Sequence, residues 1–209
     1  MADGILFDLD GTLWDSLDGI CLAWNQALAR LRPDLAGSVT PARIKGCMGM
    51  LLPDIAKALF PQVAPGEIPS LLEACCALEN EYLARHGATL CPGVAETLPL
   101  LAERCPLFIV SNCHDGYIES FFEAHGLGRY FTDWECPGRT GLPKAENIRA
   151  VVERSGLRNP VYVGDTQGDF KAATAAGVPF IHAAYGFGAV EGVPSIRSLA
   201  ELPALLEGL

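Results

Sequence analysis

Residues 5–12 have the sequence ILFDLDGT, in which an apolar run ends in two carboxylates and a Gly-Thr turn. A short apolar run that stops at such a turn is typical of a buried β-strand. Burying an unpaired charge is very costly, so the carboxylates of Asp8 and Asp10 must be hydrated, bound to a metal ion or held in a polar site. For this motif alone, a strand that ends at an acidic surface turn is the simpler interpretation.

A second apolar run, residues 108–110, leads into a hydroxyl and an amide, Ser111 and Asn112. Serines in this position usually cap the next helix, so the motif is weak by itself. A third signal is Lys144, one of only four lysines in the chain, at the predicted start of a helix. The helix macrodipole disfavours a cation there, which indicates a partner for its ammonium group. In isolation, an exposed helix lysine is the simpler interpretation.

The fourth motif, residues 161–169 (VYVGDTQGD), places Asp165 and Asp169 around a glycine-rich turn after a predicted strand. It is moderately specific, because a plain surface turn seldom combines two acids with two glycines. In open α/β sheets, ligands bind outside the carboxyl ends of the strands. A parallel sheet would therefore gather one set of side chains in a single crevice: Asp8, Asp10, Ser111, Lys144, Asp165 and Asp169.

Four carboxylates in one crevice repel one another strongly. At an effective dielectric constant of about 20, two unit charges about 4 Å apart interact with about 4 kcal/mol. A divalent cation removes this repulsion, and a donor set made of oxygen alone favours Mg²⁺, which keeps several waters and pairs well with phosphate. The sequence therefore predicts a Mg²⁺ site at the end of the sheet.

Short β-prone runs alternate with helix-like segments over most of the chain. The predicted strands are residues 5–9, 107–110, 161–163 and 178–183. The predicted helices between or after the later strands are residues 96–104, 116–125, 144–155 and 168–176. This alternation predicts an α/β fold with a parallel sheet that is covered by helices on both faces.

Residues 15–87 differ from the rest, because they contain helix-like segments but no convincing strand. Residues 16–31 and 69–86 carry apolar side chains at helical spacing. A helical insert after the first strand is the simplest account. We therefore expect a discontinuous α/β catalytic core of residues 1–14 and 88–209, and a helical cap domain of residues 15–87.

Composition limits the classes of function. The 209-residue chain has a formal net charge of −10, which argues against a general nucleic-acid or anionic-membrane footprint. No apolar run is long enough to span a bilayer. The eight cysteines contain no Cys-x-x-Cys pair, so neither a zinc site nor a disulfide framework is indicated. Reduced thiols and a start interrupted by acidic residues lead us to expect a cytoplasmic protein.

The order of motifs, Asp-x-Asp-Gly-Thr, strand-Ser, Lys and Gly-Asp-x-x-x-Asp, resembles the haloacid-dehalogenase-like hydrolase superfamily. The helical insert directly after the first motif is similar to the cap of its phosphoglycolate-phosphatase and β-phosphoglucomutase branch. The resemblance covers nearly the whole chain, and the first and fourth motifs are highly specific in combination. It implies a Rossmann-like core and a Mg²⁺-dependent phosphatase of small phosphorylated metabolites.

The resemblance implies roles for the two acids of the first motif. Asp8 would be the nucleophile that attacks phosphorus and forms an aspartyl-phosphate, a step that needs no base because a carboxylate is already ionised at neutral pH. Asp10 would protonate the leaving alkoxide and then activate water, which requires surroundings that raise its pKa. The backbone carbonyl of Asp10 would also contact Mg²⁺.

The other motifs would bind the phosphoryl group and the metal. Ser111 and Asn112 would bind phosphoryl oxygens, and Lys144 would neutralise charge on the phosphoryl group and the nucleophile. Asp165 would hold Mg²⁺ directly, and Asp169 would complete or orient that shell. The implied metal ligands are Asp8, Asp10, Asp165 and Asp169.

Two assignments stay open. The commonest family pattern has the lysine immediately before a proline, whereas Lys144 follows Pro143, so Arg139 is the alternative cation. In the predicted cap, Arg43 and Lys45 are candidate contacts for a second anionic group of the substrate. Solvated helix ends explain them equally well.

Three other functions compete with a phosphatase. A phosphosugar mutase on the same scaffold would return the phosphoryl group from the aspartyl-phosphate to a sugar. A dehalogenase is disfavoured, since dehalogenation needs no metal and the resembling dehalogenases lack the acid that Asp10 supplies. A catalytically silent binding module is disfavoured because all the acids are present. The sequence determines neither the natural substrate nor the oligomeric state.

Overall fold

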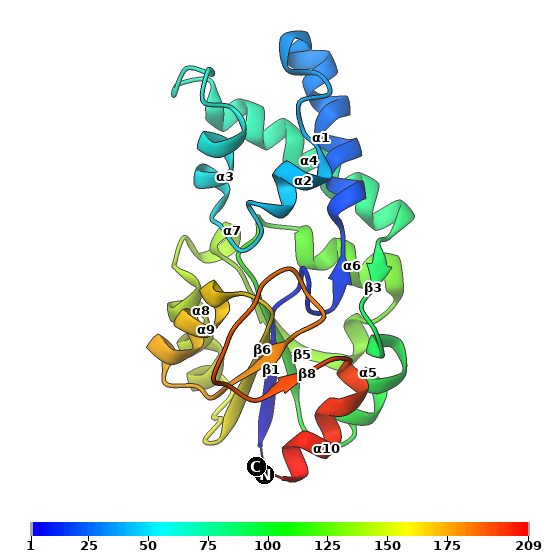
Figure 1. Cartoon of the computed structure of the whole chain (residues 1–209), viewed down its shortest axis with the longest axis vertical. Coiled ribbons are helices and arrows are strands. Elements are labelled where there is room, and N and C mark those ends of the chain that lie inside the picture. The colour runs from blue at the N-terminus through cyan, green and yellow to red at the C-terminus, as the bar shows by residue number, and fades with distance from the viewer. Residues whose placement is uncertain (1, 209) are drawn as a thin grey trace.

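The computed structural model describes residues 2–208 and has two parts, which are shown in Figure 1. The lower part in this view is a parallel β-sheet with helices on both faces. A group of helices formed by residues 17–86 lies above the carboxyl ends of the strands. The candidate site lies between the two parts.

The main sheet has the strand order β5-β4-β1-β6-β7-β8, and every neighbouring pair is parallel. The strands are β1 (Gly4–Phe7), β4 (Leu107–Val110), β5 (Phe131–Glu135), β6 (Pro160–Gly164), β7 (Phe180–Ala183) and β8 (Ser195–Ile196). Because β1 lies between β4 and β6, the segments that follow these three strands meet at one edge. The predicted α/β fold with a parallel sheet is confirmed.

Two strands of the main sheet, β5 and β8, were not expected from the sequence, and neither was the short pair β2 (Trp14–Asp15) and β3 (Thr89–Leu90). β5 and β8 lie at outer edges of the main sheet, where a strand need not be apolar throughout. β5 has polar Thr132 and Asp133 near its centre, and β8 has only two residues. Neither segment therefore contains the continuous apolar run by which the central strands were predicted.

Successive residues of the central strands face opposite sides of the sheet, as the pleat of a strand requires. Phe7 and Ile109 pack on one side with α5 (Val94–Ala102) and α6 (Tyr117–His125). Leu6 and Phe108 pack on the other side with α8 (Lys144–Arg154) and α9 (Gln167–Ala176). The remaining α-helices among the described residues of this part are α7 (Pro137–Thr140) and α10 (Leu202–Glu207). Among residues 2–208, no helix is both long enough and apolar enough to span a membrane.

The upper part, which we call the cap from its position above the strand ends, contains four α-helices and has a hydrophobic core of its own. The helices are α1 (Leu17–Leu31), α2 (Pro41–Lys45), α3 (Leu52–Leu59) and α4 (Ile68–His86). α1 packs against α4, and Trp24, Leu28 and Phe60 lie in their shared core. The chain enters and leaves this part through a short antiparallel pair, β2 (Trp14–Asp15) with β3 (Thr89–Leu90).

Candidate active site

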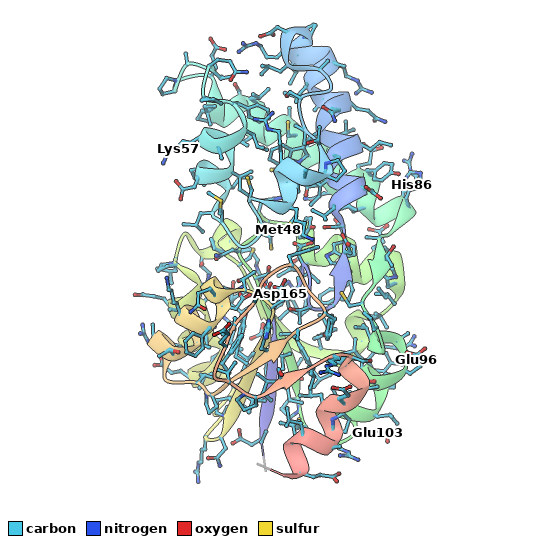
Figure 2. All side chains as sticks on the ribbon, viewed as in Figure 1. Met48, Lys57, His86, Glu96, Glu103 and Asp165 are labelled. Carbon is cyan, nitrogen blue, oxygen red and sulfur yellow. The ribbon has the colours of Figure 1, made fainter. Side chains whose placement is uncertain are left out.

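The carboxyl edge of the sheet brings together side chains from distant parts of the sequence. Asp8 directly follows β1, and its backbone N–H donates to the Val163 carbonyl of β6 at 2.8 Å. Ser111 follows β4, and Asp165 follows β6. Figure 2 shows Asp165 at this edge, with Met48 of the cap above it.

Lys144 is the cation of this site. It is the first residue of α8 and is buried, and its Nζ lies 2.7 Å from Oδ1 of Asp8 and also contacts Oδ1 of Asp169. Burial alone would lower the pKa of Lys144, but the two carboxylates raise it well above its ordinary value, so the ammonium group stays charged. Arg139 lies elsewhere, where its guanidinium donates to the Trp134 carbonyl and covers the Trp134 ring.

Asp169 positions Lys144. Its Oδ2 accepts hydrogen bonds from the backbone N–H and hydroxyl of Thr166, at 2.9 and 2.6 Å, in a capping box that begins α9. Burial acts to raise the pKa of Asp169, but the Lys144 ammonium and the Thr166 donors hold it below its usual value. Both oxygens of this carboxylate are therefore engaged, and it remains ionised.

Asp165 is fully buried, and only one of its two carboxylate oxygens accepts a hydrogen bond from the described chain. Its Oδ2 accepts from the Phe187 backbone N–H at 2.6 Å, whereas Oδ1 has no hydrogen-bond partner in residues 2–208. Burial, followed by repulsion from Asp8 and Asp169, raises the pKa of Asp165 to about 8. An orphaned buried carboxylate oxygen is costly unless something absent from the protein pairs with it.

Glycine makes room for this carboxylate. Gly11, in the Asp-Gly-Thr turn, has a φ of +79°, and a Cβ added there would lie 2.3 Å from Oδ2 of Asp165. A Cβ at Gly186 would lie 2.3 Å from Cβ of Asp165. Two chain segments thus approach Asp165 more closely than any residue with a side chain would allow.

The three acids fit a hard divalent cation. Asp8, Asp165 and Asp169 each offer an oxygen, and these oxygens lie within 4.8 Å of one another. Burial and the neighbouring Asp169 raise the pKa of Asp8 to about 6, despite its contact with Lys144. The raised pKa values of Asp8 and Asp165, the orphaned oxygen of Asp165 and a donor set of oxygen alone all fit a site that such an ion would stabilise.

Asp10 lies outside this cluster and has two hydroxyl partners that the sequence did not suggest. Its Oδ1 accepts from Ser16 Oγ at 2.5 Å and from the Tyr117 hydroxyl at 2.8 Å. Burial raises the pKa of Asp10, and these hydrogen bonds oppose the rise. Ser16 precedes α1 and Tyr117 begins α6, so only the tertiary fold brings them to this carboxylate.

Ser111 and Asn112 face the cap across a cavity. Ser111 is buried in the cavity wall. The Asn112 amide donates to the Gly49 carbonyl, in the loop between α2 and α3, at 2.9 Å, while its Oδ1 is buried without a partner in the described chain. This hydrogen bond joins the two parts of the molecule beside the nucleophile candidate, Asp8.

Neither cationic cap candidate lines the cavity. The Arg43 guanidinium donates to the backbone carbonyls of Ser38 and Leu59, at 2.6 Å each, and so connects segments of the cap. The Nζ of Lys45 lies 5.9 Å from the centre of the Phe187 ring. Lys45 thus contacts the sheet-containing part of the chain at a point outside the cavity. The structure therefore does not bring Arg43 to the site, and it places Lys45 at the margin.

Cys113 and His114, which follow Asn112 in the sequence, also line the cavity but add no charge to it. Cys113 is next to Cys136, and burial raises its pKa well above the ordinary value, so it is a thiol rather than a thiolate. Burial lowers the pKa of His114 to about 4, so its ring is neutral at pH 7. Its Nε2 lies 2.8 Å from Oδ1 of Asn80 on α4, which makes it a second link between core and cap.

Comparison with known proteins found one family model and several similar proteins. The family model described as haloacid dehalogenase-like hydrolase matches residues 5–183. The phosphoglycolate phosphatase of Escherichia coli strain K12 is 29% identical to the chain over an alignment of 212 residues, which covers 91% of this chain and 84% of that protein. The phosphoglycolate phosphatase of Pseudomonas syringae pv. syringae is 29% identical, with 88% and 70% covered. A hydrolase of the haloacid dehalogenase-like family from Streptococcus pneumoniae has the same fold, with a TM-score of 0.83 at 21% identity over 98% of both chains.

Proposed function

The chain belongs to the haloacid dehalogenase-like hydrolase family, and from this premise we propose its function. The protein is a phosphatase, a phosphoric monoester hydrolase that acts on small phosphorylated metabolites with Mg²⁺ as its cofactor. The observation that carries this assignment is the buried cluster of Asp8, Asp165 and Lys144, with an orphaned oxygen on Asp165. The curated relatives are named phosphoglycolate phosphatase, so phosphoglycolate is a natural member of any test panel.

Asp8 is the proposed nucleophile. Lys144 holds its Oδ1, and no hydrogen bond from residues 2–208 reaches its other oxygen. A carboxylate oxygen of Asp8 attacks phosphorus, the bond from phosphorus to the ester oxygen breaks, and an aspartyl-phosphate forms. Lys144 keeps the carboxylate oriented and reduces its repulsion from the phosphate dianion.

Asp10 is the proposed acid and base. Its raised pKa favours the protonated form that donates a proton to the departing alkoxide. The resulting carboxylate then takes a proton from the water that attacks the aspartyl-phosphate, which releases inorganic phosphate and restores Asp8. The hydroxyls of Ser16 and Tyr117 fix the Asp10 carboxyl group for both transfers.

The metal would be held by the carboxylates of Asp8 and Asp165 and, by family resemblance, by the backbone carbonyl of Asp10. Asp169 would orient this set through Lys144. When bound, Mg²⁺ supplies the positive charge that allows an anionic nucleophile and a phosphate dianion to approach each other.

Residues 15–87 would act as the cap domain, and residues 1–14 and 88–209 as the catalytic core. Ser111 and Asn112 would bind phosphoryl oxygens at the floor of the cavity. The contacts from Asn112 to Gly49 and from His114 to Asn80 would hold the cap over the floor. A closed cap excludes water from the first transfer.

The test is phosphate release from a panel of phosphorylated metabolites, with Mg²⁺ and with a chelator. Asp8→Asn should lower kcat/KM by at least about 10³-fold, because it removes the nucleophile. Asp18→Asn, the same change at an exposed position of α1, should leave kcat/KM unchanged. Full activity in chelator would contradict the Mg²⁺ assignment, and full activity of Asp8→Asn would contradict the nucleophile. A requirement for a bisphosphate activator would favour the mutase.

A further inference from the structure

The cap side of the cavity contains no cation. In residues 2–208, no lysine or arginine lines the cavity, and Lys144 below it is bound to Asp8 and Asp169. The imidazole of His114 is neutral at pH 7 because burial lowers its pKa to about 4. A second anionic group on a substrate would therefore find no positive partner in this wall.

Among residues 2–208, the one acidic side chain that the cap contributes to the cavity wall is Glu79, from the middle of α4. It is buried, and its Oε2 accepts a hydrogen bond from Trp24 Nε1 at 2.5 Å. No group of residues 2–208 donates a hydrogen bond to Oε1. Burial raises the pKa of Glu79 to about 8, so the carboxyl group is mostly protonated at pH 7 and can donate from Oε1.

The rest of the cap wall is apolar. Its main side chains are Ile20, Ile44, Met48, Met50, Leu52 and Ile55. A second hollow adjoins the cavity at Leu52 and Asn112, and it is lined by further apolar residues such as Leu51 and Leu142. Methionine and leucine side chains suit alkyl or ring carbons of a ligand, whereas a carboxylate or second phosphate would lose its hydration there without compensation.

We propose that this cap-side subsite binds an uncharged leaving group, with an apolar frame that packs against Met48 and Met50 and a hydroxyl or carbonyl oxygen that pairs with Glu79. The subsite selects against phosphate monoesters that carry a second anionic group. This inference rests on the proposed phosphatase function, since the cavity floor must bind the phosphoryl group for the leaving group to reach α4.

A matched pair of substrates tests the inference on the unaltered protein. 2-Hydroxyethyl phosphate and phosphoglycolate share their carbon skeleton and differ in a hydroxymethyl group against a carboxylate. We expect kcat/KM with Mg²⁺ to be at least about tenfold higher for 2-hydroxyethyl phosphate, because only the carboxylate must be desolvated without a partner. Equal values, or a preference for phosphoglycolate, would overturn the inference.

Acetyl phosphate separates this failure from that of the proposed function. It is small and activated, so its hydrolysis does not depend on contacts with the cap wall. If acetyl phosphate is hydrolysed in an Asp8-dependent manner and phosphoglycolate is the better ester, the phosphatase stands and only the subsite assignment is wrong. If no phosphate is released from any of the three compounds, the proposed function and the inference fall together.

Variants of Glu79 test its part in the subsite. Propyl phosphate replaces the hydroxyl of 2-hydroxyethyl phosphate by a methyl group, so the ratio of the two kcat/KM values reports recognition of that hydroxyl. Glu79→Leu should lower this ratio about tenfold, and Glu79→Gln, which keeps a donor, should lower it less. Turnover of acetyl phosphate checks that each variant is folded. An unchanged ratio in a folded Glu79→Leu variant would show that Glu79 does not contact the leaving group.

Discussion

The two walls of the cavity are built in opposite ways. The core wall, taken together with the groups directly beneath it, concentrates charge. Asp8 and Asp10 line the cavity, and beneath them the carboxylates of Asp8 and Asp169 lie on either side of the Lys144 ammonium group. The cap wall is apolar, and its one acid, Glu79, is held in the neutral form by burial. The difference separates two tasks: the core wall performs chemistry that is common to all phosphate monoesters, and the cap wall contacts the part in which substrates differ.

The two walls also differ in what stabilises them. In the core wall, each buried charge depends on its neighbour, so removal of one partner leaves an uncompensated ion. In the cap wall, stability comes from the burial of apolar side chains, which tolerates substitution by residues of similar volume. Substitutions in the core wall should therefore change activity and stability together, whereas those in the cap wall should change selectivity.

The largest effect is expected from Lys144→Met, which keeps an unbranched side chain of similar length and removes its charge. We expect kcat/KM to fall about 10²- to 10³-fold, since an electrostatic contact to the reacting groups is lost. Without metal, the free energy of unfolding should fall by about 3–5 kcal/mol, because Asp8 and Asp169 are left unpaired. Steady-state kinetics and urea denaturation measure the two effects.

Arg139→Met is the matched control. Arg139 is exposed, and its guanidinium contacts the carbonyl oxygen and the ring of Trp134. Its loss should change stability by no more than about 0.5 kcal/mol and leave kcat/KM unchanged. If Arg139→Met lost as much activity as Lys144→Met, the core wall described above would not be the catalytic one.

Sequence alone could predict the core wall because its residues follow strands. Asp8, Ser111 and Asp165 each come directly after a β-prone run, and a parallel sheet brings such positions to one edge. The Thr166-x-x-Asp169 spacing is a capping-box pattern that could have indicated how Asp169 is held. For these residues at the strand ends, local sequence and chain topology were enough.

The cap wall could not be predicted in the same way. Glu79 and Glu81 lie two residues apart on α4, and only the packing of that helix buries the first and exposes the second. Arg43 has the charge that an anion site needs, but backbone carbonyls of the cap occupy its guanidinium. In the core wall, the contact of Tyr117 with Asp10 was equally unpredictable, because the two residues lie 107 positions apart in the sequence. Such contacts arise from tertiary packing, which leaves no local signal.

A smaller effect on stability is expected from Gly11→Ala, because the backbone of Gly11 lies against the carboxylate of Asp165. Gly11→Ala and Gly37→Ala place the same methyl group on backbone with φ of +79° and +75°, respectively. The Cβ at position 11 would lie 2.3 Å from Asp165 Oδ2, whereas no atom lies within 4 Å at position 37. Both variants should lose about 1 kcal/mol from the unfavourable φ. Gly11→Ala should lose a further ~1–3 kcal/mol from overpacking.

The difference between the two variants isolates the crowding at Asp165. Urea denaturation gives the free energies of unfolding, and titration calorimetry gives the Mg²⁺ affinity. Gly11→Ala should weaken Mg²⁺ binding at least about tenfold, since a displaced Asp165 costs about 1.4 kcal/mol or more of binding energy, and Gly37→Ala should not. Equal losses of stability and of Mg²⁺ affinity in both variants would mean that Gly11 is needed only for the positive φ of the turn and not for the position of the Asp165 carboxylate.

Glu79→Gln in the cap wall should have the smallest effect on activity, and its signature is a change of stability with pH. The pKa of Glu79 is raised from an ordinary 4.5 to about 8, so the folded protein retains a proton that the unfolded chain loses. The stability that this group contributes is therefore fully present below pH 4.5 and is lost as the pH rises to about 8. Glutamine stays neutral throughout, so the variant lacks this loss.

The quantity to measure is the free energy of unfolding of the wild type minus that of Glu79→Gln, from urea denaturation at a series of pH values. This difference should fall with a slope of up to about 1.4 kcal/mol per pH unit between the two pKa values and then level off. Asp8 and Asp165 also have raised pKa values, but they are present in both proteins, so their effects cancel. Glu81→Gln, on the exposed side of the same helix, is the control and should give a flat difference. A flat difference for Glu79→Gln as well would mean that Glu79 is ionised and hydrated in the folded protein, and the cap wall would then carry a charge.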